Sequence, residues 1–401
     1  MRFYSIPAAL CVLSLPVFAH ADNLKARHER IAHKRQTTSP PPGSSGAAPP
    51  PGATPSSSGP PPPATFTALD TGTGIPPLSS ITSGMPTQAT LAPSVTFTPG
   101  ASPPVSGAPP LPSRAPFVIA DWPPVNVVPP GNSPEVTEWM KELDGHNIPD
   151  LSPTINGSCE DDPKAAADSA SRGWWTCGGI TRATDIVNCP DKLTWGISFD
   201  DGPSPYTRKL LKYLDEKDLK AMFFVVGSRI LERPEILVEE YMAGHEISVH
   251  TWSHSKPLTS LTNAEVVAEL GWTRKIIKDV LGVSPTTFRP PWGDIDDRVR
   301  AISMAMGMIP ILWTSTPATG PFDTNDWKVA GGLVPGPASF DTFNAILGNA
   351  STMETGFIVL QHDLYEITVD LAIGYTLNAA QTHSPAFNVS TDSSVEVVRQ
   401  S

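Results

Sequence analysis

The sequence TWGISFDDGP, residues 194–203, gives the first indication of both the fold and the chemistry. Its apolar beginning, followed by a Gly-Pro turn signal, is typical of a short strand buried on both faces. Asp200 and Asp201 come directly at the end of this run. Adjacent carboxylates repel one another, and an Asx-type turn would require only one of them. The stretch therefore predicts a buried strand over 194–200 that ends in a pair of acidic residues with a chemical role.

Short apolar runs and helical patterns alternate around this stretch, from Cys189 to about His383. Such alternation predicts an α/β fold with a mainly parallel sheet, and six or more strand-helix units favour a barrel. Thr262 and Glu265 form a capping box at the start of one predicted helix. Further strands are predicted at 221–227, 246–251, 286–293, 307–314 and 356–362, and helices at 206–214, 234–244, 262–281 and 295–306.

Polar side chains stand at the ends of several predicted strands. The acidic pair ends one strand, and His250, Arg289 and His362 lie at the ends of three others. In a β/α barrel the carboxyl ends of the strands share one face, where the chemistry gathers. We therefore expect these scattered side chains to converge.

The motif HTWSH places His250 and His254 four residues apart. This spacing alone is a weak indication of a metal site, because the chain has 9 His residues and two unrelated loop residues would look the same. Two imidazoles and one carboxylate, however, make up the three protein ligands of a catalytic zinc site with an open position for water. One Asp of the pair 200–201 could bind the metal, and its neighbour could accept a proton from that water.

Two other residues allow alternative interpretations. His362 could protonate a leaving group, or it could be an ordinary satisfied polar residue. Arg289, which precedes two prolines, could pair with a buried carboxylate or bond the backbone carbonyls of a loop. The residues alone leave both choices open.

The net charge and the N-terminal sequence indicate which partners and which cellular compartment to expect. The 401-residue chain has a formal net charge of −12 and no basic cluster, which argues against a nucleic-acid partner. Residues 1–21 combine a basic start, a short apolar core and an AHA site, which predicts a secretory signal peptide. A membrane anchor is the alternative, but the apolar run is short for a membrane span. We expect a secreted protein without a transmembrane segment.

The region after the signal peptide has a biased composition. Residues 36–113 are rich in Pro, Ser, Thr and Gly, and Asp70 is their one charged residue. Such a segment buries too little apolar surface to offset its ordering entropy, which predicts a disordered, O-glycosylated stalk over 22–115. Lys34-Arg35 is either a dibasic processing site or two solvated charges. The remaining predicted parts are an N-terminal extension packing on the barrel at 116–189, the barrel domain at 190–385 and a C-terminal tail at 386–401.

Three cysteines, Cys159, Cys177 and Cys189, follow the predicted signal peptide. In an oxidising compartment this odd number predicts one disulfide and one further thiol, and the sequence does not decide the pairing. Secretion also makes the three N-x-S sequons candidate N-glycosylation sites, and they lie at Asn156, Asn349 and Asn388.

The motifs SFDDGPSP, HTWSH, RPPWG, FDTNDW and IVLQHD occur in the order expected of the polysaccharide deacetylases, the NodB homology or carbohydrate esterase 4 family. Residues 190–382 resemble fungal chitin deacetylases, especially those of basidiomycetes, and the resemblance extends more loosely back to about residue 120. It implies a distorted (β/α) barrel with fewer strands than a full one. It also implies a secreted, metal-dependent hydrolase that removes N-acetyl groups from chitin and yields chitosan and acetate.

The resemblance further implies a role for each motif residue. A divalent metal, Zn²⁺ or alternatively Co²⁺, would be bound by Asp201, His250 and His254. Asp200 would be the catalytic base and would be held by Arg289. The other implied roles are those of His362 as general acid, Asp326 rather than Asp323 as its partner, the Trp292 amide as an oxyanion donor, and Trp327 and Leu360 as the lining of the acetyl pocket.

Two other functions fit the same scaffold. One is a catalytically silent protein that binds chitin or the cell wall, and the other is a deacetylase of another acetylated polysaccharide. Asp200, His254 and His362 are all intact, which favours an enzyme. We expect a monomer that acts on chitin or chito-oligosaccharides, outside the cell or at the cell wall. The ending SSVEVVRQS has no hydrophobic tail, so a glycolipid anchor is not expected.

Overall fold

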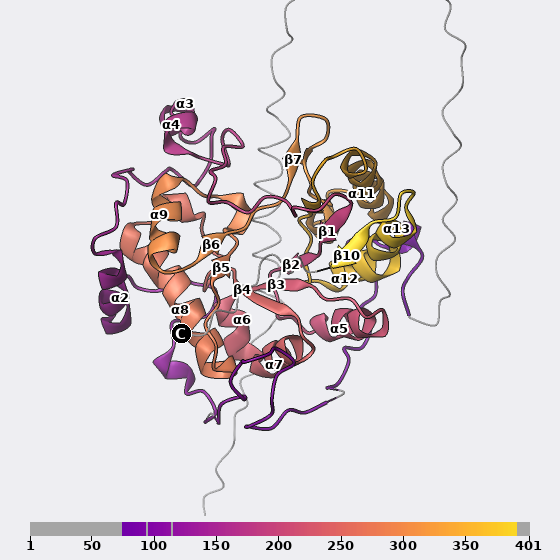
Figure 1. The fold of residues 1–401 in the computed structure, drawn as a ribbon, viewed down its shortest axis with the longest axis horizontal. Coiled ribbons are helices and arrows are strands. Elements are labelled where there is room, and N and C mark those ends of the chain that lie inside the picture. The colour runs from indigo at the N-terminus through magenta and orange to yellow at the C-terminus, as the bar shows by residue number, and fades with distance from the viewer. Residues whose placement is uncertain (1–73, 94, 114, 391–401) are drawn as a thin grey trace, which may run out of the picture. The chain divides into compact units, whose positions relative to one another are not determined.

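The computed structural model describes residues 74–93, 95–113 and 115–390 (Figure 1). The predicted signal peptide, the Lys34-Arg35 pair, most of the predicted stalk and nearly all of the predicted tail lie outside these residues. Within the described ranges, no helix is long and apolar enough to cross a membrane.

A parallel sheet of five strands forms the centre of the described structure, in the order β2-β3-β4-β5-β6. Neighbouring strands pair in register, for example Phe199 with Phe223 and Phe223 with Ile247. The Phe199 and Phe223 side chains are fully buried, as expected of strands covered on both faces. The five strands are β2 (Ser198–Asp200), β3 (Met222–Val225), β4 (Glu246–Val249), β5 (Thr287–Phe288) and β6 (Ile309–Pro310).

A second parallel sheet has the order β10-β1-β9. Its strands are β1 (Thr194–Gly196), β9 (Phe357–Ile358) and β10 (Asn388–Ser390). The prediction of one strand over 194–200 is therefore wrong, because the chain leaves one sheet after Gly196 and enters the other at Ser198. Because the strand is interrupted between Gly196 and Ser198, this one short segment contributes a strand to each of the two sheets.

Backbone contacts outside the named strands connect the two sheets into a distorted barrel. On one side, the Asp200 amide donates to the Gln361 carbonyl at 3.0 Å, next to a parallel bridge between Asp200 and His362. On the other side, Ile186 pairs with Ile311, and the Thr314 amide donates to the Ile358 carbonyl at 3.0 Å. The predicted α/β fold with a mainly parallel, barrel-like sheet is confirmed.

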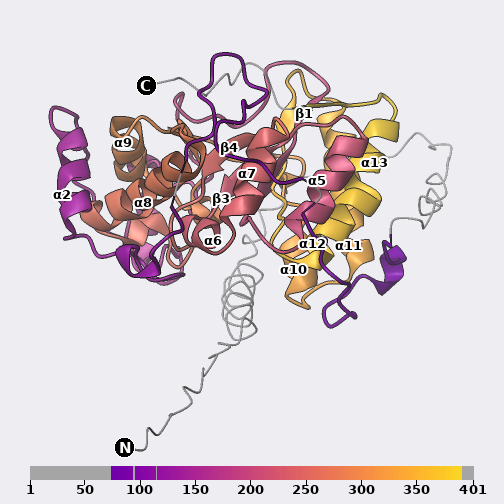
Figure 2. The same ribbon diagram turned by 90° about the horizontal axis from the view of Figure 1, so that it is seen from below.

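Helices surround the strands (Figures 1 and 2). The longest begins with the predicted Thr262–Glu265 capping box and ends before Gly282, whose φ of 79° suits a left-handed C-cap. The predicted helices are confirmed as α5 (Thr207–Glu216), α7 (Pro234–Met242), α8 (Asn263–Leu281) and α9 (Asp297–Ala305). Elements not predicted are α6 (Gly227–Glu232), α10 (Asp326–Ala330), α11 (Gly336–Ala350), α12 (Glu366–Leu371), the π-helical η7 (Ala372–Thr376), α13 (Leu377–Thr382) and the hairpin of β7 (Ser315–Thr316) and β8 (Gly320–Pro321).

Residues 74–93 and 95–113, here called the arm, differ from the predicted disordered stalk. Ile81 is fully buried, and its carbonyl accepts the Gly336 amide of α11 at 2.9 Å. The Gln88 amide donates to the Glu366 carboxylate of α12 at 3.1 Å, and Leu111 is also buried. Figure 2 shows the arm, in indigo and purple, running across α7 and α5. The prediction of disorder from composition is wrong for the arm, because a few buried apolar side chains among many prolines are enough to hold an extended chain against the domain.

The segment between the arm and the barrel contains short helices. One of them, α2 (Pro134–Trp139), lies so close to α8 that a Cβ on Gly271 would come within 2.3 Å of the Trp139 ring. A disulfide joins Cys159 and Cys177, so the one predicted disulfide forms, and Cys189 is buried and takes no part in it.

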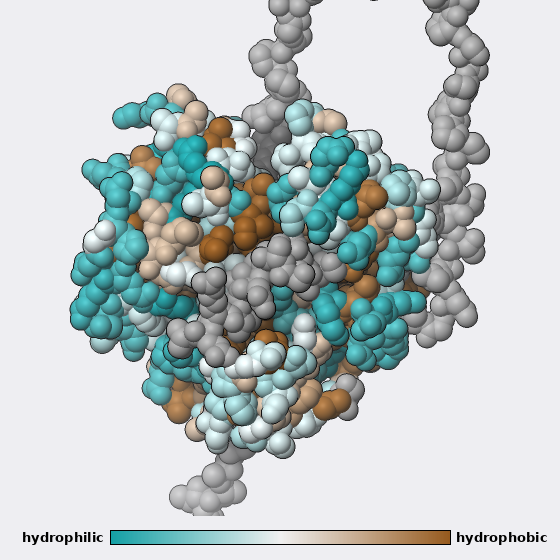
Figure 3. Space-filling model, in the orientation of Figure 1, coloured by the Kyte–Doolittle hydropathy of each residue, from teal (hydrophilic) through white to brown (hydrophobic). Residues whose placement is uncertain are grey.

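The outer rim of the face in Figure 3 is mainly hydrophilic, and hydrophobic residues gather nearer its centre. The remaining short helices are η2 (Leu78–Ser80), η3 (Ile119–Asp121), η4 (Met140–Leu143), α3 (Pro163–Ala167), α4 (Ser169–Arg172), η5 (Leu258–Ser260) and η6 (Pro291–Gly293).

Candidate active site

Three ligand atoms of the kinds that metals favour converge at the carboxyl ends of β2 and β4. Asp201 follows β2 directly, and His250 follows β4. Asp201 Oδ1 lies 3.4 Å from His250 Nε2 and 3.1 Å from His254 Nε2. All three residues are buried, and one ligand atom from each lies within 4.8 Å of the others. This separation is the one expected of side chains that share a single small ion.

The hydrogen bond on the far side of His250 tests whether these residues fit a cation. His250 Nδ1 lies 2.7 Å from the Arg289 carbonyl, which can only accept, so Nδ1 must carry the proton. In the neutral ring, Nε2 then presents a lone pair toward Asp201 Oδ1 at 3.4 Å. Two lone pairs facing each other in a buried site repel, and a cation between them removes that repulsion. The residues therefore fit a divalent metal, and the Arg289 carbonyl fixes the orientation of the His250 ring.

Asp201 is suited to remain an anion in this site. Burial alone would raise the pKa of its carboxyl group, but the surrounding positive charge, including that of Arg229, outweighs burial and holds the pKa well below its usual value. Arg229 of α6 also donates to the Asp201 carbonyl oxygen. Asp201 has a positive φ of 81°, which turns its side chain off the strand direction.

The loop that carries both histidines is held from behind by Glu269 of α8. One oxygen of this buried carboxylate accepts the backbone amides of Trp252 and Ser253, at 2.7 and 2.9 Å. The loop needs such support because Thr251 and His254 both have positive φ, at 66° and 48°. Glu269 was not predicted from the sequence, although a carboxylate on the apolar face of a predicted helix indicates a buried polar contact.

Asp200, the other member of the acidic pair, has a different set of contacts. Its Oδ1 accepts a hydrogen bond from Arg289 Nη1 at 2.6 Å, and the same Nη1 lies 3.0 Å from Ser198 Oγ. The Arg289 guanidinium is fully buried and stacks 3.9 Å above the centre of the Phe224 ring. Asp200 Oδ2 is 3.9 Å from His250 Nε2, farther than the Asp201 oxygen. Asp200 thus lies beside the three ligand atoms while its orientation is set by Arg289.

His362 forms a buried pair with Asp326, which begins α10. His362 Nδ1 lies 2.8 Å from Asp326 Oδ1, and the His362 amide donates to Asp326 Oδ2 at 2.8 Å. Burial opposes the charged imidazolium, but Asp326, with added effects of Asp201 and Asp200, raises the His362 pKa to about 10. Asp323 instead accepts from Trp327 Nε1, at 3.3 and 3.2 Å. The geometry therefore pairs His362 with Asp326 and not with Asp323.

The three other expected pocket residues come from three separate segments of the chain. Trp292 lies in η6 with its ring centre 4.6 Å from that of His254. Trp327 of α10 and Leu360, which follows β9, are nearly buried. The Leu360 carbonyl accepts from Thr324 Oγ1 at 3.0 Å, which ties the segment before His362 to the loop before α10.

The three sequons lie away from these residues in different surroundings. Asn156 and Asn388 are exposed. Asn349 is half-buried near the end of α11, and its Oδ1 accepts from Thr316 Oγ1 at 2.9 Å. Asn156 and Asn388 are therefore the more accessible candidates for glycosylation.

An Asp-His-His group that could hold a cation lies beside an Arg-held carboxylate and an Asp-held histidine at the strand ends of a parallel barrel, which is the arrangement of a metal-dependent hydrolytic site. Residues 187–311 match the sequence model of the family described as polysaccharide deacetylase. The chain is 35% identical to Chitin deacetylase 2 of Saccharomyces cerevisiae over 234 residues, which cover 58% of this chain and 67% of that protein. The chain belongs to the polysaccharide deacetylase family.

Two further similarities were found. The chain is 57% identical over 310 residues to Chitin deacetylase 1 of Cryptococcus neoformans var. grubii, which is 76% of this chain. It spans 65% of the length of that relative, just under two thirds. The solved structure of the chitin deacetylase from Colletotrichum lindemuthianum is 22% identical with a TM-score of 0.47, covering 54% of this chain and 95% of that one.

Proposed function

We propose that this chain is a secreted, metal-dependent deacetylase that hydrolyses the N-acetyl groups of N-acetylglucosamine units in chitin, giving chitosan and acetate. The observation that carries the proposal is the convergence of Asp201, His250 and His254 within 4.8 Å, directly beside the Arg289-held Asp200. Both fungal relatives described above are chitin deacetylases by name, which supports chitin as the substrate.

The proposed metal is Zn²⁺, with Co²⁺ as a substitute. Two imidazole nitrogens and one carboxylate oxygen are a usual ligand set of catalytic zinc. A cation bound by Asp201, His250 and His254 would supply Lewis-acid activation of water and of the acetamide carbonyl.

Asp200 is the proposed general base. It lies next to the ligand atoms, and the Arg289 contact at 2.6 Å orients its carboxylate. Asp200 takes one proton from the attacking water, whose oxygen forms the new bond to the acetyl carbon. Because Asp200 Oδ2 is farther from His250 than Asp201 Oδ1 is, Asp201 is the better metal ligand and Asp200 the better proton acceptor.

His362 is the proposed general acid. With a pKa raised to about 10, its ring is protonated at neutral pH, and Asp326 holds Nδ1. Nε2 is then the ring nitrogen that donates a proton to the leaving amine as the carbon–nitrogen bond breaks. The products are the glucosamine amine and acetic acid, which ionises to acetate as the amine takes up its proton, and the proton held by Asp200 passes back to His362 and restores the acid.

Three other residues complete the proposed site. The backbone N–H of Trp292 is the proposed donor to the oxyanion, the kind of contact that often dominates catalysis. Trp327 and Leu360 are the proposed lining around the acetyl methyl group. Their placement in η6 after β5, in the first turn of α10 and after β9 is consistent with one pocket at the strand ends.

The setting of the enzyme is part of the proposal. Residues 1–21 act as a signal peptide, and the mature protein works as a monomer outside the cell or at the cell wall. Asn156, Asn349 and Asn388 are proposed N-glycosylation sites.

Acetate release from chitin oligomers tests this function. The purified chain should release acetate, lose this activity after treatment with a chelator, and regain it on addition of Zn²⁺ or Co²⁺. Acetylated xylan run in parallel distinguishes another polysaccharide substrate. Retention of the protein on chitin without any acetate release would instead indicate a silent binding protein and would contradict the proposal.

A further inference from the structure

The loop that carries the proposed oxyanion donor has an unfavourable backbone conformation. Trp292 has φ 57° and ψ 11°, and Gly293 follows with φ 69°. A left-handed conformation is unfavourable for an L-residue with a bulky side chain, and it persists only where the surroundings impose it. The contacts around residues 290–294 must therefore determine where the Trp292 amide points.

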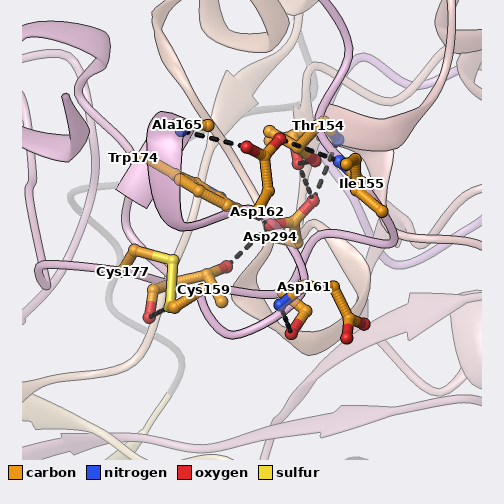
Figure 4. Close-up of a disulfide and its surroundings, with 12 residues drawn as sticks. Thr154, Ile155, Cys159, Asp161, Asp162, Ala165, Trp174, Cys177 and Asp294 are labelled. Carbon is orange, nitrogen blue, oxygen red and sulfur yellow. Dashed lines mark hydrogen bonds between the residues drawn. A yellow bond between two sulfur atoms is a disulfide. The ribbon is translucent and has the colours of Figure 1, made fainter. Parts of the chain in front are cut away.

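The next residue, Asp294, makes such contacts with both of its oxygens (Figure 4). Asp294 as a whole residue is 1% exposed. Oδ1 accepts from Trp174 Nε1 at 2.8 Å and from Thr176 Oγ1 at 2.7 Å. Oδ2 accepts from the Thr259 amide at 2.9 Å and from Thr259 Oγ1 at 2.6 Å. Four donors to one fully buried carboxylate make a rigid junction, because each of its two oxygens is engaged twice.

The donors come from two segments that are remote in sequence. Trp174 and Thr176 lie inside the loop closed by the Cys159–Cys177 disulfide. Thr259 lies in η5, five residues after His254. Asp294 therefore links the Trp292 loop to the segment that follows the metal-site histidines and to the extension before the barrel.

A second contact from the same disulfide-closed loop supports the Trp292 loop. A Cβ on Gly293 would lie 2.4 Å from the Trp175 ring, so this ring fills the space beside the glycine. The Trp175 amide donates to the Ile295 carbonyl at 3.0 Å. The Trp175 and Trp313 rings pack edge to face, with their centres 4.8 Å apart. The tryptophan pair 174–175 thus holds the loop on both sides of Asp294.

We propose that Asp294 is a positioning residue, which fixes the Trp292 amide at the oxyanion by tying its loop to Trp174, Thr176 and Thr259. The inference rests on the proposed deacetylase function. Asp294 touches neither substrate nor metal in this account. It acts through the backbone of residues 292–294, where the Gly293 and Asp294 amides close tight turns onto the Pro290 and Pro291 carbonyls at 3.0 Å.

Two substitutions and two measurements test the proposal. Trp174→Phe keeps the aromatic bulk and removes one hydrogen bond to Asp294, and Asp294→Asn removes the charge. Both should lower kcat on a chitin oligomer by about 10- to 100-fold, because small displacements of a catalytic group cost up to that much. KM and the affinity for Zn²⁺ should stay within about twofold. Hydrogen exchange in peptides spanning 292–296 should become faster.

Trp195→Phe is the matched control, since Trp195 is also fully buried but lies in β1, outside these loops. Its kcat and its exchange at 292–296 should match the wild type. Unchanged kcat and unchanged exchange in Trp174→Phe would overturn the proposal, and so would an equal loss of Zn²⁺ affinity, which would indicate general damage. If Asp294→Asn does not fold, Trp174→Phe decides. If the wild type releases no acetate, the proposed function is wrong. Hydrogen exchange at 292–296 then still tests whether the Asp294 hydrogen bonds hold the Trp292 loop in place.

Discussion

Asp326 holds His362 through both of its carboxylate oxygens. Oδ1 lies 2.8 Å from the ring Nδ1, and Oδ2 accepts the His362 backbone amide at 2.8 Å. One carboxylate thus fixes the position of the backbone, the orientation of the ring and the nitrogen that carries a proton. Since Asp326 begins α10 and His362 follows β9, this pair also ties a helix to the end of a barrel strand.

Replacement of this carboxylate should change the pH dependence of the enzyme. Asp326→Asn removes the charge that raises the His362 pKa toward 10, so that pKa falls. A general acid must be protonated, and activity is lost as pH rises through its pKa. The alkaline limb of the kcat profile should therefore move to lower pH, and kcat at its optimum should fall by about 10²-fold or more. Acetate release measured across pH checks both effects.

Asp323→Asn is the matched comparison for this experiment. Asp323 lies three residues away, but its carboxylate accepts from Trp327 Nε1 and not from His362. The alkaline limb should stay at its wild-type position in this variant, whatever happens to KM. An alkaline limb that does not move in Asp326→Asn, or that moves equally in both variants, would contradict the assigned pair.

The two adjacent carboxylates should respond differently to the same substitution. Asp200→Asn should reduce kcat by about 10²–10⁴-fold and leave the metal bound, because Asp200 pairs with Arg289 and is outside the three ligand atoms. Asp201→Asn should weaken metal binding by more than about 100-fold, since loss of a direct ligand exceeds the usual effect of outer contacts. Metal content by atomic absorption and acetate release by enzyme assay separate the two. Full activity in Asp200→Asn would remove it from the mechanism.

The arm should contribute to the stability of the domain. Ile81 is fully buried against α11, so Ile81→Ala should lower the free energy of unfolding by about 2–5 kcal/mol. Leu91→Ala is the control within the same arm, because Leu91 is 39% exposed. This substitution should change the free energy of unfolding little. Denaturant unfolding of the three proteins gives the comparison. Equal stability of wild type and Ile81→Ala would show that the arm is not docked in solution.

The candidate site could be predicted largely because its residues sit at strand ends and occur in recognisable order. Strand ends are readable from short apolar runs, and a parallel barrel brings them to one face. Even the choice of Asp326 over Asp323 agrees with the geometry. The contacts that hold these residues could not be predicted, because Glu269 bonds backbone amides of a loop whose turn is not encoded locally.

The fold was predictable in its periodic parts and not elsewhere. Helix α8 has a capping box and a regular apolar face, and both identify it from the sequence. Helix α11 was not predicted, although Phe340, Phe343 and Leu347 have helical spacing in the sequence. The division of 194–200 into β1 and β2 depends on contacts with remote strands, so local periodicity cannot show it.

The proposed chemistry depends on one divalent cation bound by Asp201, His250 and His254. Anomalous diffraction from crystals grown with Zn²⁺, recorded on both sides of the zinc edge, tests it most directly. We expect a single strong peak within about 2.0–2.3 Å of Asp201 Oδ1, His250 Nε2 and His254 Nε2. A zinc peak bound elsewhere, or none at these three atoms in crystals of active protein, would contradict it.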